Sequence, residues 1–119
     1  MAALQIAERQ VGEVTVLDCW GQITIGDASE TLRAKIKDLI DNDRKRVLLH
    51  LGGVHQVDSS GLGSLVAVYT AVQKCGGDLK LVQLSDRLED LMVMTKLVTV
   101  FDTYKDETVA LESFKPAHH

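Results

Sequence analysis

A short polar segment, Asp58-Ser59-Ser60-Gly61-Leu62-Gly63, holds the residue types best suited to chemistry in this sequence. A carboxylate precedes two serines, and a serine hydroxyl can accept a phosphoryl group. The glycines allow the backbone to turn and another molecule to approach closely. Asp and Ser before a helix are also its ordinary caps. The segment therefore predicts either a plain helix cap or an accessible loop that receives or binds an anion.

The elements on either side of this segment must position it. Residues 47–51 form a short, mostly apolar run, which is typical of a buried central strand. After the segment, apolar residues recur at helical spacing, namely Leu62, Leu65, Val66, Tyr69 and Val72. The N-terminus of a helix has free backbone N–H groups and a partial positive charge, which favour phosphate and other anions. We therefore expect Ser59 or Ser60 to be the N-cap of this helix.

The rest of the chain alternates between strand-like and helix-like segments. Strands are predicted at residues 4–9, 14–20, 47–51, 54–57, 79–84 and 98–104. Helices are predicted at residues 27–42, 62–75, 86–95 and 106–114, with Asp27 and Asp86 capping the first and third. Strands joined by single helices imply right-handed crossovers. The sequence predicts an α/β fold: a mixed, largely parallel sheet of four to five strands, with an N-terminal β-hairpin and about four helices.

The length of 119 residues fits one domain, predicted over residues 1–116. His118-His119 look like the start of a purification tag, so residues 117–119 are interpreted as a tail. Aromatic residues make up only 4% of the chain, so the core must be aliphatic. Trp20 is still expected in the core. Cys19 and Cys75 are expected to be reduced thiols, buried or half-buried.

Charge and hydropathy argue against two classes of partner. The net charge is -4, and the basic residues are scattered apart from Arg44-Lys45-Arg46. Binding to nucleic acid needs clustered positive charge, so no direct nucleic-acid partner is expected. No signal peptide is recognisable, and no apolar run approaches the ~20 residues that cross a bilayer. The sequence therefore predicts a cytoplasmic protein without membrane insertion.

Three kinds of chemical site are poorly matched by the residue spacing. His50 and His55 lack a Cys or carboxylate that would complete a ligand set, so neither a metal nor a cofactor is expected. Gly61-Leu62-Gly63 lacks the third glycine of a dinucleotide-binding fingerprint. No serine lies in a Gly-x-Ser-x-Gly elbow. We therefore expect no catalytic residues, and the protein is not predicted to be an enzyme.

The run from residue 47 to residue 65, VLLHLGGVHQVDSSGLGSL, resembles the signature of STAS domains. The resemblance continues through residues 76–81 and 91–101, and more loosely through residues 17–25. This family includes the tails of sulfate transporters and the bacterial anti-sigma factor antagonists. Because no transmembrane segment is present, the chain is more similar to the stand-alone antagonists.

The resemblance implies a regulatory role for the Asp58 loop. The serine after the loop aspartate, Ser59, would be phosphorylated by a serine kinase that is also an anti-sigma factor; Ser60 is the alternative acceptor. Unphosphorylated protein would bind this kinase and free a sigma factor. Phosphorylated protein would be released and reset by a serine phosphatase. The resemblance places partner contacts at Gln22, Ile23, Thr24, Asp58, Ser60, Gly61, Leu62 and Gly63.

One stretch departs from the family pattern. Many relatives have an acidic residue two or three places after the glycine that matches Gly21, where this chain has Ile23 and Thr24. Gln22 replaces a frequent glutamate. Since this stretch commonly touches the kinase, the departure concerns the identity of the partner. A non-switching STAS scaffold in a larger signalling assembly is the alternative function.

Overall fold

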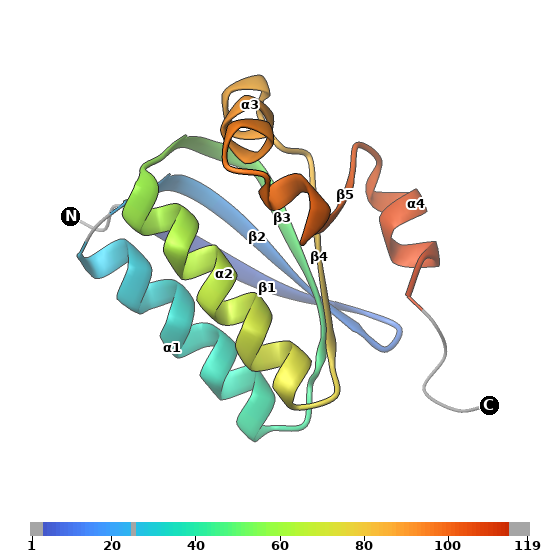
Figure 1. Cartoon of the computed structure of the whole chain (residues 1–119). Helices are drawn as coiled ribbons and strands as arrows, with labels where there is room; N and C mark the ends of the chain where they lie inside the picture. The colour runs from blue at the N-terminus through green and yellow to red at the C-terminus, as the bar shows by residue number, and fades with distance from the viewer. Residues whose placement is uncertain (1–3, 25, 115–119) are drawn as a thin grey trace.

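The computed structural model describes residues 4–24 and 26–114 (Figure 1). The strands are β1 (Leu4–Val11), β2 (Val14–Ile23), β3 (Arg46–Val57), β4 (Asp78–Val82) and β5 (Asp102–Tyr104). The helices are α1 (Asp27–Asp41), α2 (Ser59–Lys74), α3 (Asp86–Met94) and α4 (Glu107–Glu112), with a short 3-10 helix, η1 (Leu97–Thr99), between α3 and β5. The predicted tail, residues 117–119, lies outside the described ranges.

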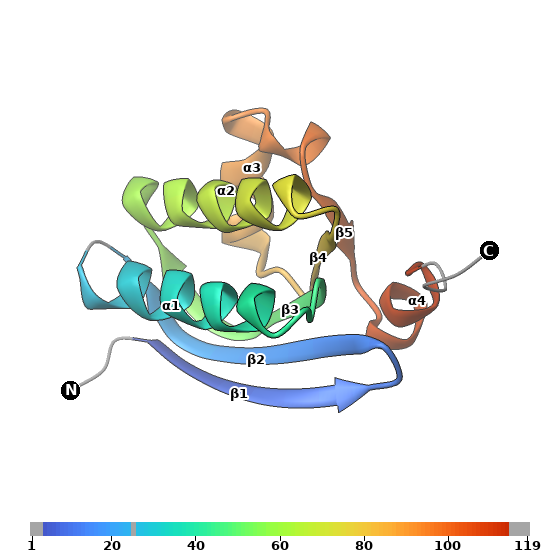
Figure 2. The same cartoon turned by 90° about the horizontal axis from the view of Figure 1, so that it is seen from below.

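The strands form one five-stranded sheet in the order β1-β2-β3-β4-β5. β1 and β2 pair as an antiparallel hairpin, and every other neighbouring pair is parallel. Helices α1 and α2 lie side by side over one face, and α4 lies beyond the other (Figure 2). The predicted α/β fold with its mixed sheet, N-terminal hairpin and four helices is confirmed.

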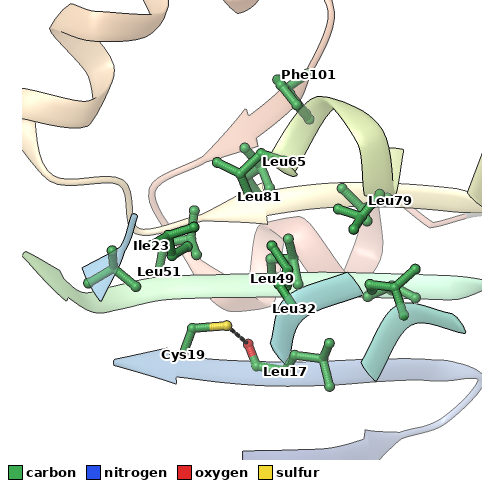
Figure 3. Close-up of a cluster of buried hydrophobic side chains, with 14 of the residues drawn as sticks. Leu17, Cys19, Ile23, Leu32, Leu49, Leu51, Leu65, Leu79, Leu81 and Phe101 are labelled. Atoms are coloured by element: carbon green, nitrogen blue, oxygen red, sulfur yellow. Dashed lines mark hydrogen bonds between the residues drawn. The ribbon is translucent and has the colours of Figure 1, made fainter. Parts of the chain in front are cut away.

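The main core fills the space between the sheet and helices α1 and α2 (Figure 3). Its centre is aliphatic and fully buried, with side chains from three strands and both helices: Leu17, Leu49, Leu81, Leu32 and Leu65. A smaller cluster on the opposite face packs Val16, Leu48 and Val82 against Ala110 and Phe114 of α4. The central strands are thus buried on both faces, as their apolar sequences indicate.

Two predictions about side-chain burial are wrong. Trp20 is 40% exposed, and its indole N–H donates to Gln5 Oε1 at 3.0 Å. Its neighbour Cys19 points into the main core, so Trp20 points to the opposite face of the sheet, where it is not part of the cluster under α4. Cys19 is buried, but Cys75 after α2 is exposed. Burial, with a smaller effect from Asp18, raises the pKa of the Cys19 thiol to about 12, which keeps this thiol unreactive.

Several predicted boundaries differ from the structure. Residues 98–104 do not form one strand, because Lys96 has a left-handed backbone (φ 64°) and the chain turns through η1 before β5. Asp27 is the first residue of α1, and Gly26 is its N-cap. Ser85, rather than Asp86, caps α3, because its backbone is extended and its hydroxyl accepts from the Leu88 N–H at 3.2 Å.

Strand β3 is longer than the sequence pattern predicts. It continues through Gly52-Gly53 to Val57 instead of breaking there. A Cβ on Gly53 would lie 2.5 Å from the Trp20 Cβ, so a glycine is required where β2 approaches. Strand β3 therefore ends directly before Asp58 and the start of α2.

Candidate functional site

Asp58 joins the end of β3 to the start of α2 and is the N-cap of that helix. Its backbone is extended, and its carboxylate accepts from the Gly61 N–H at 2.7 Å. The prediction that Ser59 or Ser60 caps the helix is therefore wrong. The cap lies one residue earlier because the aspartate, still in strand-like conformation, can reach the third residue of the helix.

Because Asp58 is the N-cap of α2, the Ser59 side chain does not cap the helix. Ser59 is the first residue of α2 and is exposed. Within residues 4–24 and 26–114, its hydroxyl has no hydrogen-bond partner. Ser60 is also exposed, and its carbonyl accepts from Ser64 Oγ at 3.1 Å. The structure therefore places two accessible hydroxyls at a helix N-terminus.

Gly61 fixes where this turn sits against the sheet. It is buried, and a Cβ at this position would lie 1.8 Å from the Ile23 carbonyl oxygen. The Asp58 N–H also donates to that oxygen at 3.4 Å. Ile23 and Val57 pair in register where β2 and β3 end side by side. The end of β2 and the first turn of α2 are thus in direct contact, although the two segments are far apart in sequence.

The structure separates the expected partner-contact residues into two sets. Gln22 and Thr24 are half-buried beside the loop, while Ser60 and Gly63 are exposed on it. Asp58 is half-buried and caps α2. Ile23, Gly61 and Leu62 are buried, so the Ile23 and Leu62 side chains and the Gly61 backbone pack inside the protein and position the loop. The exposed residues at the start of α2 are thus Ser59, Ser60 and Gly63, and the only side chains among them are two serine hydroxyls.

The local charges allow an added phosphate. No acidic residue lies within the first turn of α2, and the Asp58 carboxylate at its N-cap accepts from the Gly61 N–H. The N-terminus of a helix stabilises a negative group by roughly 0.3–1 kcal/mol. His50 and His55 precede the loop on β3, and His55 is exposed. The arrangement suits an acceptor of a phosphoryl group.

A second polar cluster lies elsewhere on the sheet and was not found from the sequence. The ligand atoms of Asp18, His50 and Glu107 lie within 4.8 Å of one another, and each residue is half-buried. The prediction that no carboxylate accompanies His50 is therefore wrong. Asp18 and His50 are register partners on β2 and β3, and Glu107 comes from the first turn of α4. Only the topology brings these three segments together.

Arg9 already occupies the centre of this cluster. Its guanidinium donates to both Asp18 oxygens at 2.6 and 2.9 Å, and to Glu107 at 2.7 and 3.3 Å. The hydrogen bond from Arg9 lowers the pKa of the Asp18 carboxyl. His50 Nδ1 accepts the Gly52 N–H at 3.3 Å, which leaves the proton of a neutral ring on Nε2. The cluster is an ion-pair network that joins β1, β2 and α4.

Comparison with known proteins places the chain in a family. The STAS domain model matches residues 5–110. The anti-sigma-B factor antagonist of Bacillus subtilis is 37% identical over 82 residues, which are 69% of this chain and 73% of that protein.

Among solved structures, an anti-sigma factor antagonist from Mycobacterium paratuberculosis has a TM-score of 0.79 at 20% identity, covering 92% of each chain. The antagonist SpoIIAA has TM-scores of 0.68 in its unphosphorylated form, at 21% identity, and 0.71 in its phosphorylated form, at 20%. The two alignments cover 91% of this chain, and 96% and 97% of the two SpoIIAA chains. None of the helices in the described ranges is both long and apolar enough to cross a membrane. This chain belongs to the STAS domain family.

Proposed function

We propose that this protein is an anti-sigma factor antagonist whose binding to its partner is switched by phosphorylation of Ser59. One observation carries the proposal: the Ser59 hydroxyl is exposed and unbonded at the first residue of α2, while Asp58 does the capping. The relatives support the class of function, since they are named as anti-sigma factor antagonists. SpoIIAA, which shares the fold, exists in phosphorylated and unphosphorylated forms.

In the proposed cycle, the unphosphorylated protein binds an anti-sigma factor that is also a serine kinase, and the sigma factor is released. The Ser59 oxygen then attacks the terminal phosphorus of a nucleoside triphosphate held by the kinase. A bond from that oxygen to phosphorus forms, the bond to the leaving nucleoside diphosphate breaks, and the hydroxyl proton passes to a base. A serine phosphatase later hydrolyses the phosphoserine. The chain itself supplies the acceptor and performs no catalysis, and the cycle takes place in the cytoplasm.

The switch should act on the interface rather than on the fold. A phosphoserine adds roughly -1.5 to -2 charges at pH 7. Within the free protein, the N-terminus of α2 partly offsets the repulsion from Asp58. In a docked complex the same group must lose water next to a carboxylate, and a like-charge juxtaposition can cost several kcal/mol. Because about 1.4 kcal/mol is tenfold in affinity, one phosphate is expected to weaken binding by about a hundredfold or more.

One observation favours the alternative, a STAS scaffold that is not switched. The stretch from Gln22 to Thr24, which lies against the loop, contains no acidic residue. A partner that binds this uncharged stretch must differ in its binding surface from a partner that binds an acidic one. Such a partner need not be a kinase, and the Ser59 hydroxyl would then serve only as a contact.

Kinase assays on the captured partner separate the two functions. Ser59→Ala, which cannot be phosphorylated at this position, is used as bait in the native lysate because it should hold the partner persistently. The captured partner is then incubated with ATP and each chain, and phosphate is located by mass spectrometry. We expect phosphate on Ser59 in the wild type and in Ser60→Ala, and none in Ser59→Ala. A partner that binds but transfers no phosphate to Ser59 would favour the scaffold.

A further inference from the structure

Exposed apolar side chains are concentrated at the end of α3 and in η1. Among the described residues, the large hydrophobic side chains with substantial exposure are Val11, Trp20, Val93, Met94, Val98, Val100 and Val109. Four of these lie within residues 93–100, and Met94, at 80%, is the most exposed of them. We call Val93, Met94, Val98 and Val100 the α3–η1 patch. These four residues lie within eight positions of the chain, on two elements that contact each other. A concentration of exposed apolar residues marks an interaction site more often than scattered single residues do.

The patch has a rigid support. Helix α3 buries Leu88 and Met92 on its inner side, so Val93 and Met94 must face outward. After Lys96, the chain returns to the core at Phe101, which is 4% exposed and packs edge-on against Tyr69 with ring centroids 5.1 Å apart. The apolar residues are therefore held between two anchored segments.

The charges at the two ends of the patch are opposite. Asp90 is exposed on the outer side of α3, one turn before Met94, and Lys96 is exposed just beyond the helix. Neither side chain has an ion-pair partner within residues 4–24 and 26–114. A surface that is acidic at one end, apolar in the middle and basic at the other end matches a copy of itself turned by 180°.

We propose that the α3–η1 patch binds the same patch of a second copy, forming a two-fold symmetric dimer. The two α3 helices would run antiparallel and cross near Val93, so that the apolar side chains meet in the middle. Asp90 of each copy would then face Lys96 of the other, and the symmetry makes this ion pair twice. A self-complementary contact of this kind closes on itself, as two-fold interfaces do.

The dimer should be weak. Stable interfaces bury about 1,200–2,000 Å² in total, which a single short helix and its following turn do not approach. We therefore expect half of the chains to be paired at roughly 0.1 mM protein. The patch uses α3 and η1, whereas the proposed switch uses the start of α2. The dimer can consequently be tested without the partner, and its failure would leave the proposed function untouched.

Sedimentation velocity of the purified chain, from about 10 μM to 1 mM, measures the pairing. The wild type should shift from monomer to dimer over this range. Met94→Asp should remain monomeric because a charge would be buried in the centre of the contact. Val109→Asp is the matched control, since Val109 is an exposed valine (50%) on α4, outside the patch, and this variant should pair like the wild type.

The charged residues provide a second, independent readout. Asp90→Lys and Lys96→Asp should each weaken pairing by about tenfold, since each places like charges opposite one another twice. The double variant Asp90→Lys/Lys96→Asp should restore pairing to near the wild-type level. Circular dichroism checks that each variant is folded, and if Met94→Asp is not, the charge variants still decide the question.

Three results would overturn the proposal. The first is a wild type that stays monomeric up to 1 mM, which would assign the patch to a different protein. The second is a double charge variant no better than the single ones. The third is an intermolecular amine cross-link from Lys96 to Lys37, which lines the apolar groove between α1 and α2 with Ile36 and Ile40, because that link would indicate a head-to-tail contact.

Discussion

The first turn of α2 and the Arg9 network are both polar clusters supported by the sheet, but they differ in how their side chains are bonded. In the network, Arg9 forms two ion pairs at once, with Asp18 and with Glu107. In the α2 turn, Asp58 holds the backbone, while the Ser59 hydroxyl is exposed without a protein partner among the described residues. The polar groups of the Arg9 network bind one another and hold two strands and a helix together, whereas the α2 turn leaves the Ser59 hydroxyl available.

This difference shows how a site can be recognised without any ligand. A polar group that is already satisfied by its neighbours contributes to the fold, and removing it should change stability. A polar group that is held in place but forms no hydrogen bond within the protein can be substituted with little loss of stability. Such a group is free to react with or bind another molecule. Substitutions in the Arg9 network should therefore change stability, whereas substitution of Ser59 should change partner binding.

Gly61→Ala should have the largest effect, because Gly61 belongs to the fold although it lies in the functional loop. The new Cβ would lie 1.8 Å from the Ile23 carbonyl oxygen, a backbone atom that cannot easily move. Overpacking typically costs 1–3 kcal/mol, and we expect about 3 kcal/mol or more here. Urea denaturation at pH 7 measures the change in the free energy of unfolding.

Gly63→Ala is the matched control for this substitution. Gly63 lies two residues further along α2, and no atom is within 4 Å of an added Cβ. Alanine in a helix interior is favoured over glycine by roughly 0.5–1 kcal/mol, so this variant should be slightly stabilised. Equal destabilisation by both variants would contradict the close contact between the loop and the end of β2.

Ser59→Asp should have the second-largest effect, this time on binding alone. The added carboxylate lies in the proposed interface beside Asp58, and we expect partner affinity to fall by about a hundredfold. The melting temperature should change little, since the N-terminus of a helix accepts negative charge. Isothermal titration calorimetry with the captured partner measures the affinity. Ser60→Asp, with the same charge one residue later, is the control and should weaken binding less; equal affinities for Ser59→Asp and the wild type would contradict the switch.

The order of elements could be predicted because each one has a local signal. The apolar residues of α2 repeat at helical spacing, and Gly76 ends that helix with a positive φ of 77°. Residues 98–104 misled the prediction because exposed valines there look like strand residues. Their backbone is set by the left-handed turn at Lys96, which neither composition nor periodicity reveals.

The position of the candidate site could be predicted from the sequence, but the roles of its individual residues could not. The Asp58-Ser59 pair follows from capping residues and glycines between a strand and a helix. Which of them caps the helix depends on a backbone angle, and the structure assigns the role to Asp58. The contact between Gly61 and Ile23 depends on the register of β2 against β3, a long-range property with no signal in either segment alone.

Asp58→Ala should have a moderate effect on stability, since it removes the cap of α2. Loss of an N-cap side chain costs about 1 kcal/mol, within a range of roughly 0.5–2 kcal/mol. Asp58→Asn should retain most of the stability, because an amide oxygen can also accept from the Gly61 N–H. Thermal unfolding of the two variants tests the assignment. Equal loss in both would mean that the charge of Asp58, rather than its acceptor geometry, stabilises the loop.

Arg9→Met should have the smallest effect, and one that depends on pH. The ion pairs are partly exposed, with 42% and 31% of the Arg9 and Asp18 side chains accessible, so their loss should cost only about 1 kcal/mol at pH 7. Arg9 lowers the pKa of Asp18 below its value in the unfolded chain. This contribution is therefore complete above the unfolded pKa of about 3.9, and it is lost as the pH falls through the lower folded value.

Urea denaturation of the wild type and Arg9→Met at pH 7 and at pH 3 tests this dependence. The difference in unfolding free energy should shrink at pH 3, because Asp18 of the unfolded chain is then largely protonated and must lose this proton on folding to form the ion pair. Partner binding at pH 7 should be unchanged by Arg9→Met, since the network already uses its charges within the fold. A variant that unfolds at the same urea concentration but loses the partner would reverse the assignment of the two clusters, making the Arg9 network the binding surface.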